Sequence, residues 1–242
     1  MIVLVERVKN YKNQKVKMNE IESNDKLLAT LNEATEVTGK ALIAGIPILG
    51  GPIIEIIDSV QSNRLAARHE EWLRNLNDRL TKIEYKVEEL GNSEFFTSSL
   101  IKATEIASKS HEKEKRDYLA NALINSIDLE SSMQTTVMIY YNLIDAYTIL
   151  HIKVLDFFNN PSQHTEETAA LYGTSSPGLL LENCREFRKV DKDLLKKVVN
   201  DLQNDGLINI SNGLNTMMTV EGAMKPRTTK LGKGLLLFIS DV

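Results

Sequence analysis

The sequence lacks the residues on which several classes of protein depend. It contains one cysteine, Cys184, among 242 residues, so no disulfide can form within the chain. It also lacks a signal peptide with a positive start, a continuous apolar core and a small-residue cleavage site. These absences predict a reducing, cytoplasmic location. The formal net charge of −4 provides no global positive field, so any contact with nucleic acid or an anionic membrane must be local.

The sequence also lacks the clusters that mark an enzyme. The four histidines are scattered, and none stands at a metal-ligand spacing from Cys184 or from another histidine. The segment that begins at His69 resembles the start of a zinc-protease helix, but Leu73 occupies the position of the second histidine. Cys184 is flanked by apolar residues, which favours a buried thiol over a nucleophile. We therefore predict no enzymatic activity, no metal, no cofactor and no small-molecule substrate.

Long apolar runs are missing, with one partial exception at residues 41–54. This segment of 14 residues carries no charge, but it contains Pro47 and Pro52, which forbid a regular helix. As a helix it would reach about 21 Å, short of the roughly 30 Å of a membrane's hydrocarbon core. Two interpretations remain: a buried apolar turn, or an element that contacts membrane conditionally. The candidate membrane residues are Ile46, Pro47, Ile48, Leu49, Pro52 and Ile53.

The strongest periodic signal lies in a long helix that is predicted to begin at Glu55. In its second half, apolar residues alternate at spacings of three and four, which is a heptad pattern. This seam consists of Leu73, Leu76, Leu80, Ile83, Val87 and Leu90. The residues Gly91-Asn92-Ser93 that follow predict a helix stop and a new N-cap. The seam is therefore expected to pack in an internal helical hairpin or in a coiled-coil dimer.

The remaining patterns predict a mainly α protein, a helical bundle followed by a small module. Further helices are expected at residues 94–107, 111–127 and 130–158. We divide the chain into a flexible leader (1–23), a helical body (24–160), a linker (161–176) and a C-terminal module (177–242).

The C-terminal module follows the order of a winged helix. Helices are predicted at 176–187 and 191–204, then a strand at 207–210, a wing at 211–226, a return strand at 227–229 and a closing helix at 230–240. Residues 201–208 (DLQNDGLI) and 229–236 (TKLGKGLL) resemble the end of the recognition helix and the second wing strand of bacterial winged-helix regulators of the multiple-antibiotic-resistance and phenolic-acid type. That resemblance covers about a quarter of the chain and implies a winged-helix-like fold.

The helical body resembles a set of uncharacterised bacterial proteins. The resemblance is carried by IPILGGP at 46–52, EWL at 71–73, the Phe95-Phe96 pair and LANAL at 119–123. It implies the same helical architecture and no particular activity.

Two hypotheses for the function follow. The first is a bacterial interaction or oligomerisation protein of a stress or phage-defence system, which binds a protein partner or itself and contacts membrane conditionally through residues 41–54. The alternative is a DNA-binding regulator whose helix 191–204 enters the major groove while the wing contacts phosphates. Its candidate nucleic-acid contacts are Lys192, Lys196, Lys197, Lys225 and Arg227. The acidic residues interleaved with the three helical lysines weigh against the second hypothesis, because they weaken attraction to phosphate.

Overall fold

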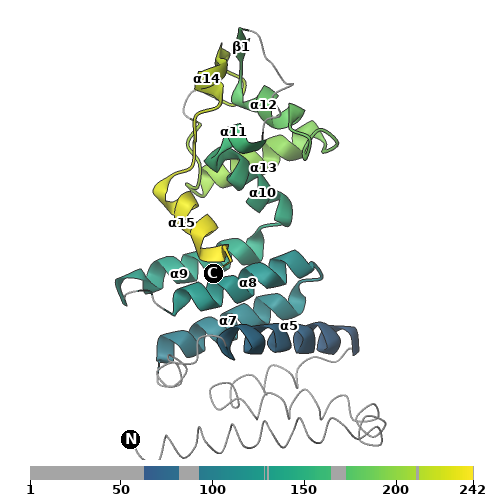
Figure 1. The fold of residues 1–242 in the computed structure, drawn as a ribbon, viewed down its shortest axis with the longest axis vertical. Helices are drawn as coiled ribbons and strands as arrows, with labels where there is room; N and C mark the ends of the chain where they lie inside the picture. The colour runs from purple at the N-terminus through teal and green to yellow at the C-terminus, as the bar shows by residue number, and fades with distance from the viewer. Residues whose placement is uncertain are drawn as a thin grey trace, which may run out of the picture. The chain divides into compact units, whose positions relative to one another are not determined.

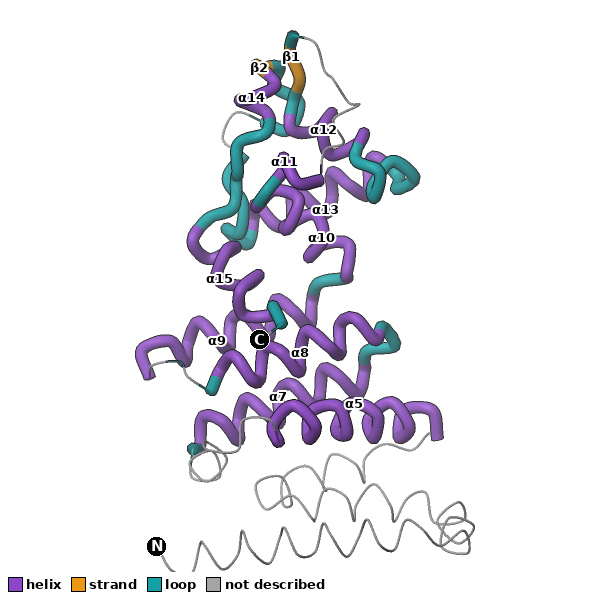
Figure 2. The backbone as a smooth tube through the Cα atoms, in the orientation of Figure 1, coloured by secondary structure: helices purple, strands orange, loops and turns teal. Residues whose placement is uncertain are grey.

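A computed structural model describes residues 63–81, 93–127, 129, 131–164, 173–210 and 213–241. The chain divides into two compact units, Met1–Glu70 and Glu71–Val242, and nearly all described residues belong to the second. Figure 1 and Figure 2 show that this second unit is mainly helical. Residues 71–160 and 177–242, which the sequence assigns to a body and a separate module, lie in this same unit.

The elements follow one another along the chain with short connections. The helices are α5 (Asn63–Thr81), α7 (Glu94–Lys109), α8 (Lys113–Ser126), η2 (Ser131–Met133, a 3-10 helix), α9 (Gln134–Ala146), α10 (Ile149–Asn159), α11 (Pro161–His164), α12 (Pro177–Asn183), α13 (Lys192–Asn204), α14 (Val220–Ala223) and α15 (Lys230–Ile239). The strands are β1 (Thr174–Ser175) and β2 (Met218–Thr219).

Helix α5 carries the first half of the predicted heptad seam. Leu73, Leu76 and Leu80 are all buried, as is Trp72, whose indole Nε1 donates to the Arg116 carbonyl of α8 at 3.0 Å. This half of the seam is therefore used in packing within the chain. The second half, which consists of Ile83, Val87 and Leu90, lies outside the described residues, and so does the apolar segment 41–54.

Helices α7, α8 and α9 pack against one another and supply much of the core. The predicted cap at Ser93 is confirmed, because its side chain accepts a hydrogen bond from the Phe96 N–H at the start of α7. Arg116 on α8 is buried and fully engaged: it donates to the carbonyls of Ser110 and His111 and pairs with Glu71 at 3.0 Å.

The single helix predicted over residues 130–158 is wrong. The chain instead forms η2 and α9, leaves the helical conformation at Tyr147 and Thr148, and starts again as α10. Thr148 and His151 form a capping box at the start of α10, and the Lys115 ammonium donates to the carbonyls of Asp145 and Tyr147 at the end of α9. These contacts satisfy the backbone groups that the break exposes.

The C-terminal residues pair their strands across a long loop. Strand β1 pairs with β2 in antiparallel register, and Ile208 forms a bridge with Thr228. Two elements that the sequence did not predict, β2 and α14, lie within the predicted wing, while α11 and β1 lie within the predicted linker. The helix predicted at 176–187 ends earlier, at Asn183, and a turn follows.

Helix α15 joins the C-terminal residues to the helical body. It packs against α8 and α10, and its last carbonyls accept hydrogen bonds from side chains of α8. The Asn121 amide donates to the Ile239 carbonyl at 3.0 Å, and the Asn125 amide donates to the Phe238 carbonyl at 2.9 Å. These bonds cap the C-terminal end of α15. Among the described residues, no helix is long and apolar enough to cross a membrane.

Candidate nucleic-acid interface

Helix α13 is an amphipathic helix with one face buried and the other exposed along its length. Its start is set by Asp191, whose carboxylate accepts from the N–H groups of Asp193 and Leu194 at 3.0 Å each. The buried face, which belongs to the helix that packs against α10, consists of Leu195, Val198, Val199 and Leu202. The opposite face is therefore free to meet a partner.

The three candidate lysines on α13 are exposed, and each is held by a carboxylate. Lys192 pairs with Glu182 of α12 at 2.6 Å, Lys196 pairs with Asp193 at 3.2 Å, and Lys197 pairs with Asp201. Exposed ion pairs of this kind contribute about 0–1 kcal/mol. A phosphate could therefore replace the carboxylates at small cost.

The two candidate contacts on the predicted wing differ in their surroundings. Lys225 is exposed. The Arg227 guanidinium instead turns into its own loop, where it donates to the carbonyls of Gly222 and Ala223 at 2.9 Å each. Burial lowers the pKa of Arg227 from its usual value. Arg227 thus holds the loop around α14 in place, and its donors are already used.

Two acidic residues at the end of α13 turn toward α10 and away from the outer face. The Tyr147 hydroxyl donates to Asp205 at 2.6 Å, and burial together with this bond raises the pKa of Tyr147. The tyrosine ring stacks on His151 with centroids 4.7 Å apart, and His151 Nε2 lies 3.3 Å from the Asp201 carboxylate. Hydrogen bonding from Lys197, and to a lesser extent from His151, lowers the pKa of Asp201.

These contacts leave the outer face of α13 less acidic than its sequence suggests. Asp191 is used as the N-cap, while Asp201 and Asp205 are bonded to side chains near the start of α10. Asp193 is the acidic residue that remains exposed near the middle of that face. Positions 196, 200 and 204 follow at helical spacing of four and place Lys196, Asn200 and Asn204 along one exposed stripe.

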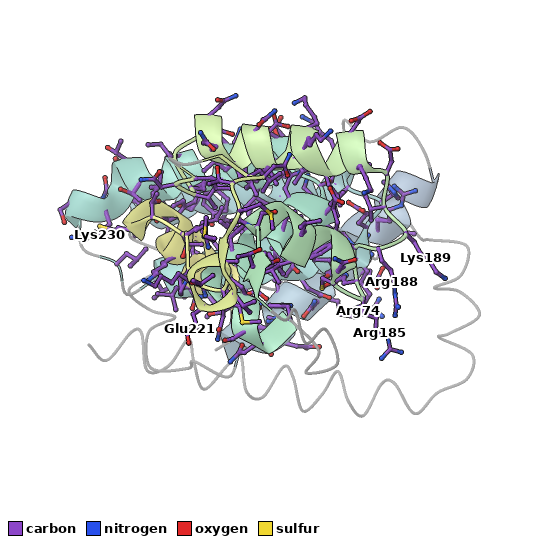
Figure 3. The ribbon with its side chains drawn as sticks, turned by 90° about the horizontal axis from the view of Figure 1, so that it is seen from above. Arg74, Arg185, Arg188, Lys189, Glu221 and Lys230 are labelled. Carbon is purple, nitrogen blue, oxygen red and sulfur yellow. The ribbon has the colours of Figure 1, made fainter. Side chains whose placement is uncertain are left out.

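The turn between α12 and α13 carries a basic cluster that the sequence reasoning missed. Arg185, Arg188 and Lys189 are exposed and form no ion pair within the ranges that the structure describes. Figure 3 shows them projecting together at one side of the ribbon, with Lys230 on the opposite side. The acidic residue of the turn, Glu186, is held 2.8 Å from Lys153 of α10. We call Arg185, Arg188 and Lys189 the basic turn.

A sequence signal for the basic turn exists in hindsight. Phe187 is apolar and buried, and it separates Arg185 from Arg188 in a stretch that immediately precedes the helix cap at Asp191. A buried anchor flanked by charges predicts that those charges point outward. The net charge of the whole chain concealed this local excess.

The other candidate chemistry does not converge in the structure. His164 lies 3.2 Å from Asp156, and Cys184 is buried with its thiol donating to the His164 carbonyl at 3.4 Å. No group of three or more potential metal ligands comes together in the part of the chain that is described.

Comparison with known proteins adds no further information. No family model, no curated protein and no solved structure matches this chain.

Proposed function

We propose that this chain is a nucleic-acid-binding protein that contacts the phosphate backbone through the basic turn and the exposed face of α13. The observation that carries the proposal is the basic turn: three exposed cations without ion-pair partners in the described ranges, next to the N-terminus of an exposed helix. The sequence from Arg185 to Asn204 holds six basic and four acidic residues, so this surface is locally positive in a chain of net charge −4.

The element order supports a winged-helix-like arrangement around this surface. Helix α12, the turn and α13 are followed by a backbone pairing in which Asn209 N–H donates to the Arg227 carbonyl at 2.8 Å and Thr229 N–H donates to the Leu207 carbonyl at 2.9 Å. In a winged helix the corresponding helix faces the nucleic acid, and the residues before it contact phosphates. The basic turn occupies that position in the chain.

The chemistry of the basic turn suits phosphate. An arginine guanidinium forms paired hydrogen bonds with phosphate oxygens, and the N-terminal end of a helix adds a partial positive charge. Each phosphate neutralised on duplex DNA changes the slope of log affinity against log salt by about −0.9. Contacts from all three residues would therefore contribute a slope of roughly −2.7.

The hypothesis of an interaction or oligomerisation protein receives less support from the described residues. Leu73, Leu76 and Leu80 of the predicted seam are buried within the chain, so they offer no surface to a second copy. The rest of that seam and the candidate membrane segment at residues 41–54 lie outside the described residues. We therefore place nucleic-acid binding first.

A salt titration of binding tests the proposal. The purified full chain is titrated into a fluorescent 20-base-pair duplex at several salt concentrations, and the double variant Arg188→Gln/Lys189→Gln is compared with it. Two lost phosphate contacts are expected to weaken binding about tenfold or more at low salt and to make the salt slope shallower by about 1.8.

The matched control removes two positive charges elsewhere. Lys230→Gln/Lys233→Gln changes exposed lysines at the start of α15, so the net charge changes by the same amount. Binding by this control is expected to stay close to wild type. Equal weakening by both double variants would mean that only net charge matters, and undetectable binding by the wild type would refute the proposal.

A further inference from the structure

The outer face of α13 carries side-chain amides beyond its lysines. Asn200, Gln203 and Asn204 are exposed, and their amides form no hydrogen bond with the described residues. They occupy the C-terminal half of the face, where Asp201 and Asp205 have turned toward His151 and Tyr147. This half of the outer face is thus polar and uncharged, while the N-terminal half is positive.

This division of the surface matches the two tasks of a DNA-reading helix. Positive groups bind the backbone, whereas a free carboxamide can donate to and accept from a base edge at once. Asn and Gln pair in this bidentate way with the N7 and N6 groups of adenine in the major groove. The face therefore places phosphate-binding groups at one end of the helix and adenine-reading groups at the other.

The dimensions of α13 fit this groove. A helix with its side chains is roughly 10–12 Å across, and the major groove of B-form DNA is about 12 Å wide. Asn200 and Asn204 lie about 6 Å apart along the helix axis, slightly less than two base-pair steps of about 3.4 Å. Their amides could then meet base pairs that are one or two steps apart.

We infer that α13 reads duplex DNA directly and that Asn200 and Asn204 determine a preference for A·T base pairs. This inference rests on the proposed function, because the basic turn must first hold the helix on the phosphate backbone. The partner is B-form DNA. The major groove of an RNA duplex is deep and narrow, which prevents a helix from reading it.

Selection from a random duplex library provides the test. The wild-type chain selects its preferred site, and binding is then measured to this site and to duplexes in which each selected A·T pair is exchanged for G·C. The variant Asn200→Ala/Asn204→Ala is compared with a control on an exposed face of α9, Gln134→Ala/Asn142→Ala. All four positions are exposed, and thermal unfolding confirms that both variants fold.

The expected result is a loss of preference without a loss of backbone contact. Wild type and control should discriminate against each exchanged pair about tenfold, and Asn200→Ala/Asn204→Ala should bind the selected and exchanged duplexes with nearly equal affinity. The salt slope of this variant should equal that of the wild type, because its phosphate contacts remain. An RNA duplex of the selected sequence should bind at least tenfold more weakly.

Failure of this inference differs from failure of the proposed function. If selection enriches no sequence, if the asparagine variant keeps its preference, or if the RNA duplex binds equally well, the inference is overturned. Nucleic-acid binding itself would still stand in each case, provided that Arg188→Gln/Lys189→Gln weakens binding more than its matched control. If that variant has no effect, the proposed function and the inference fall together.

Discussion

Substitution of Gly232 by alanine should destabilise the protein, because α15 approaches a buried backbone carbonyl at this position. A Cβ atom on residue 232 would lie 2.2 Å from the Leu207 carbonyl oxygen, 3.0 Å from its carbon and 3.3 Å from a methyl group of Leu155. Leu207 and Leu155 are buried, and the Leu207 carbonyl also accepts from the Thr229 N–H at 2.9 Å. The carbonyl therefore cannot move without breaking other contacts.

The sign of the effect depends on two opposing contributions. Alanine in place of glycine usually stabilises a helix interior by about 1 kcal/mol. Overpacking of a filled core costs about 1–3 kcal/mol, and more where the atom that must shift belongs to the backbone. We expect the steric contribution to win and the free energy of unfolding to fall by about 2 kcal/mol. For a chain of this length the midpoint of thermal unfolding would fall by roughly 4–8 °C.

Thermal and urea unfolding of Gly232→Ala check this expectation, with Gly222→Ala as the control. At Gly222 the added Cβ would lie 3.2 Å from the Thr219 hydroxyl and 3.4 Å from the Met218 sulfur, both of which can adjust. The control should stay within about 1 kcal/mol of the wild type. If Gly232→Ala were as stable as the control, α15 would not approach Leu207 as closely as the structure has it.

Two further predictions concern the acidic residues of α13. Asp193→Asn removes the carboxylate that remains exposed on the outer face and frees Lys196, so duplex binding at low salt should strengthen by about fivefold, measured by anisotropy; unchanged affinity would show that the pair with Lys196 does not compete with phosphate. The pKa of Asp201 is lowered by Lys197, so its carboxylate stabilises the fold above its ordinary pKa of 3.8, and this contribution is lost as the pH falls through the lower folded value. Asp201→Asn should therefore flatten the acid limb of stability measured by urea unfolding between about pH 5 and pH 2, and an acid limb as steep as that of the wild type would contradict this reasoning.

Local signals in the sequence predicted much of the helical framework correctly. Ser93 and Asp191 act as N-caps as expected, since a short polar side chain before an apolar periodic segment satisfies exposed backbone N–H groups wherever it occurs. The burial of Leu73, Leu76 and Leu80 likewise follows from their spacing alone. The candidate nucleic-acid residues on α13 were placed on the correct helix and are exposed.

Local patterns could not predict contacts between distant residues. The apolar periodicity from 130 to 158 continues across the break at Thr148, and the break is stabilised by Lys115, which comes from another helix. Similarly, charge counting treated Arg227 as a free cation, whereas the folded loop uses its guanidinium to bind its own carbonyls.

The amino-acid sequence by itself determined that the chain is mainly helical, where most of its helices begin, and which lysines lie on α13. Tertiary structure alone decided which charges on that helix remain available to a partner. Asp205 is bonded to Tyr147 and Asp201 lies against His151, residues more than 45 positions away in sequence, while Glu186 is held by Lys153. The electrostatic character of a surface depends on these pairings, because each bonded carboxylate is turned away from the face that a partner would meet.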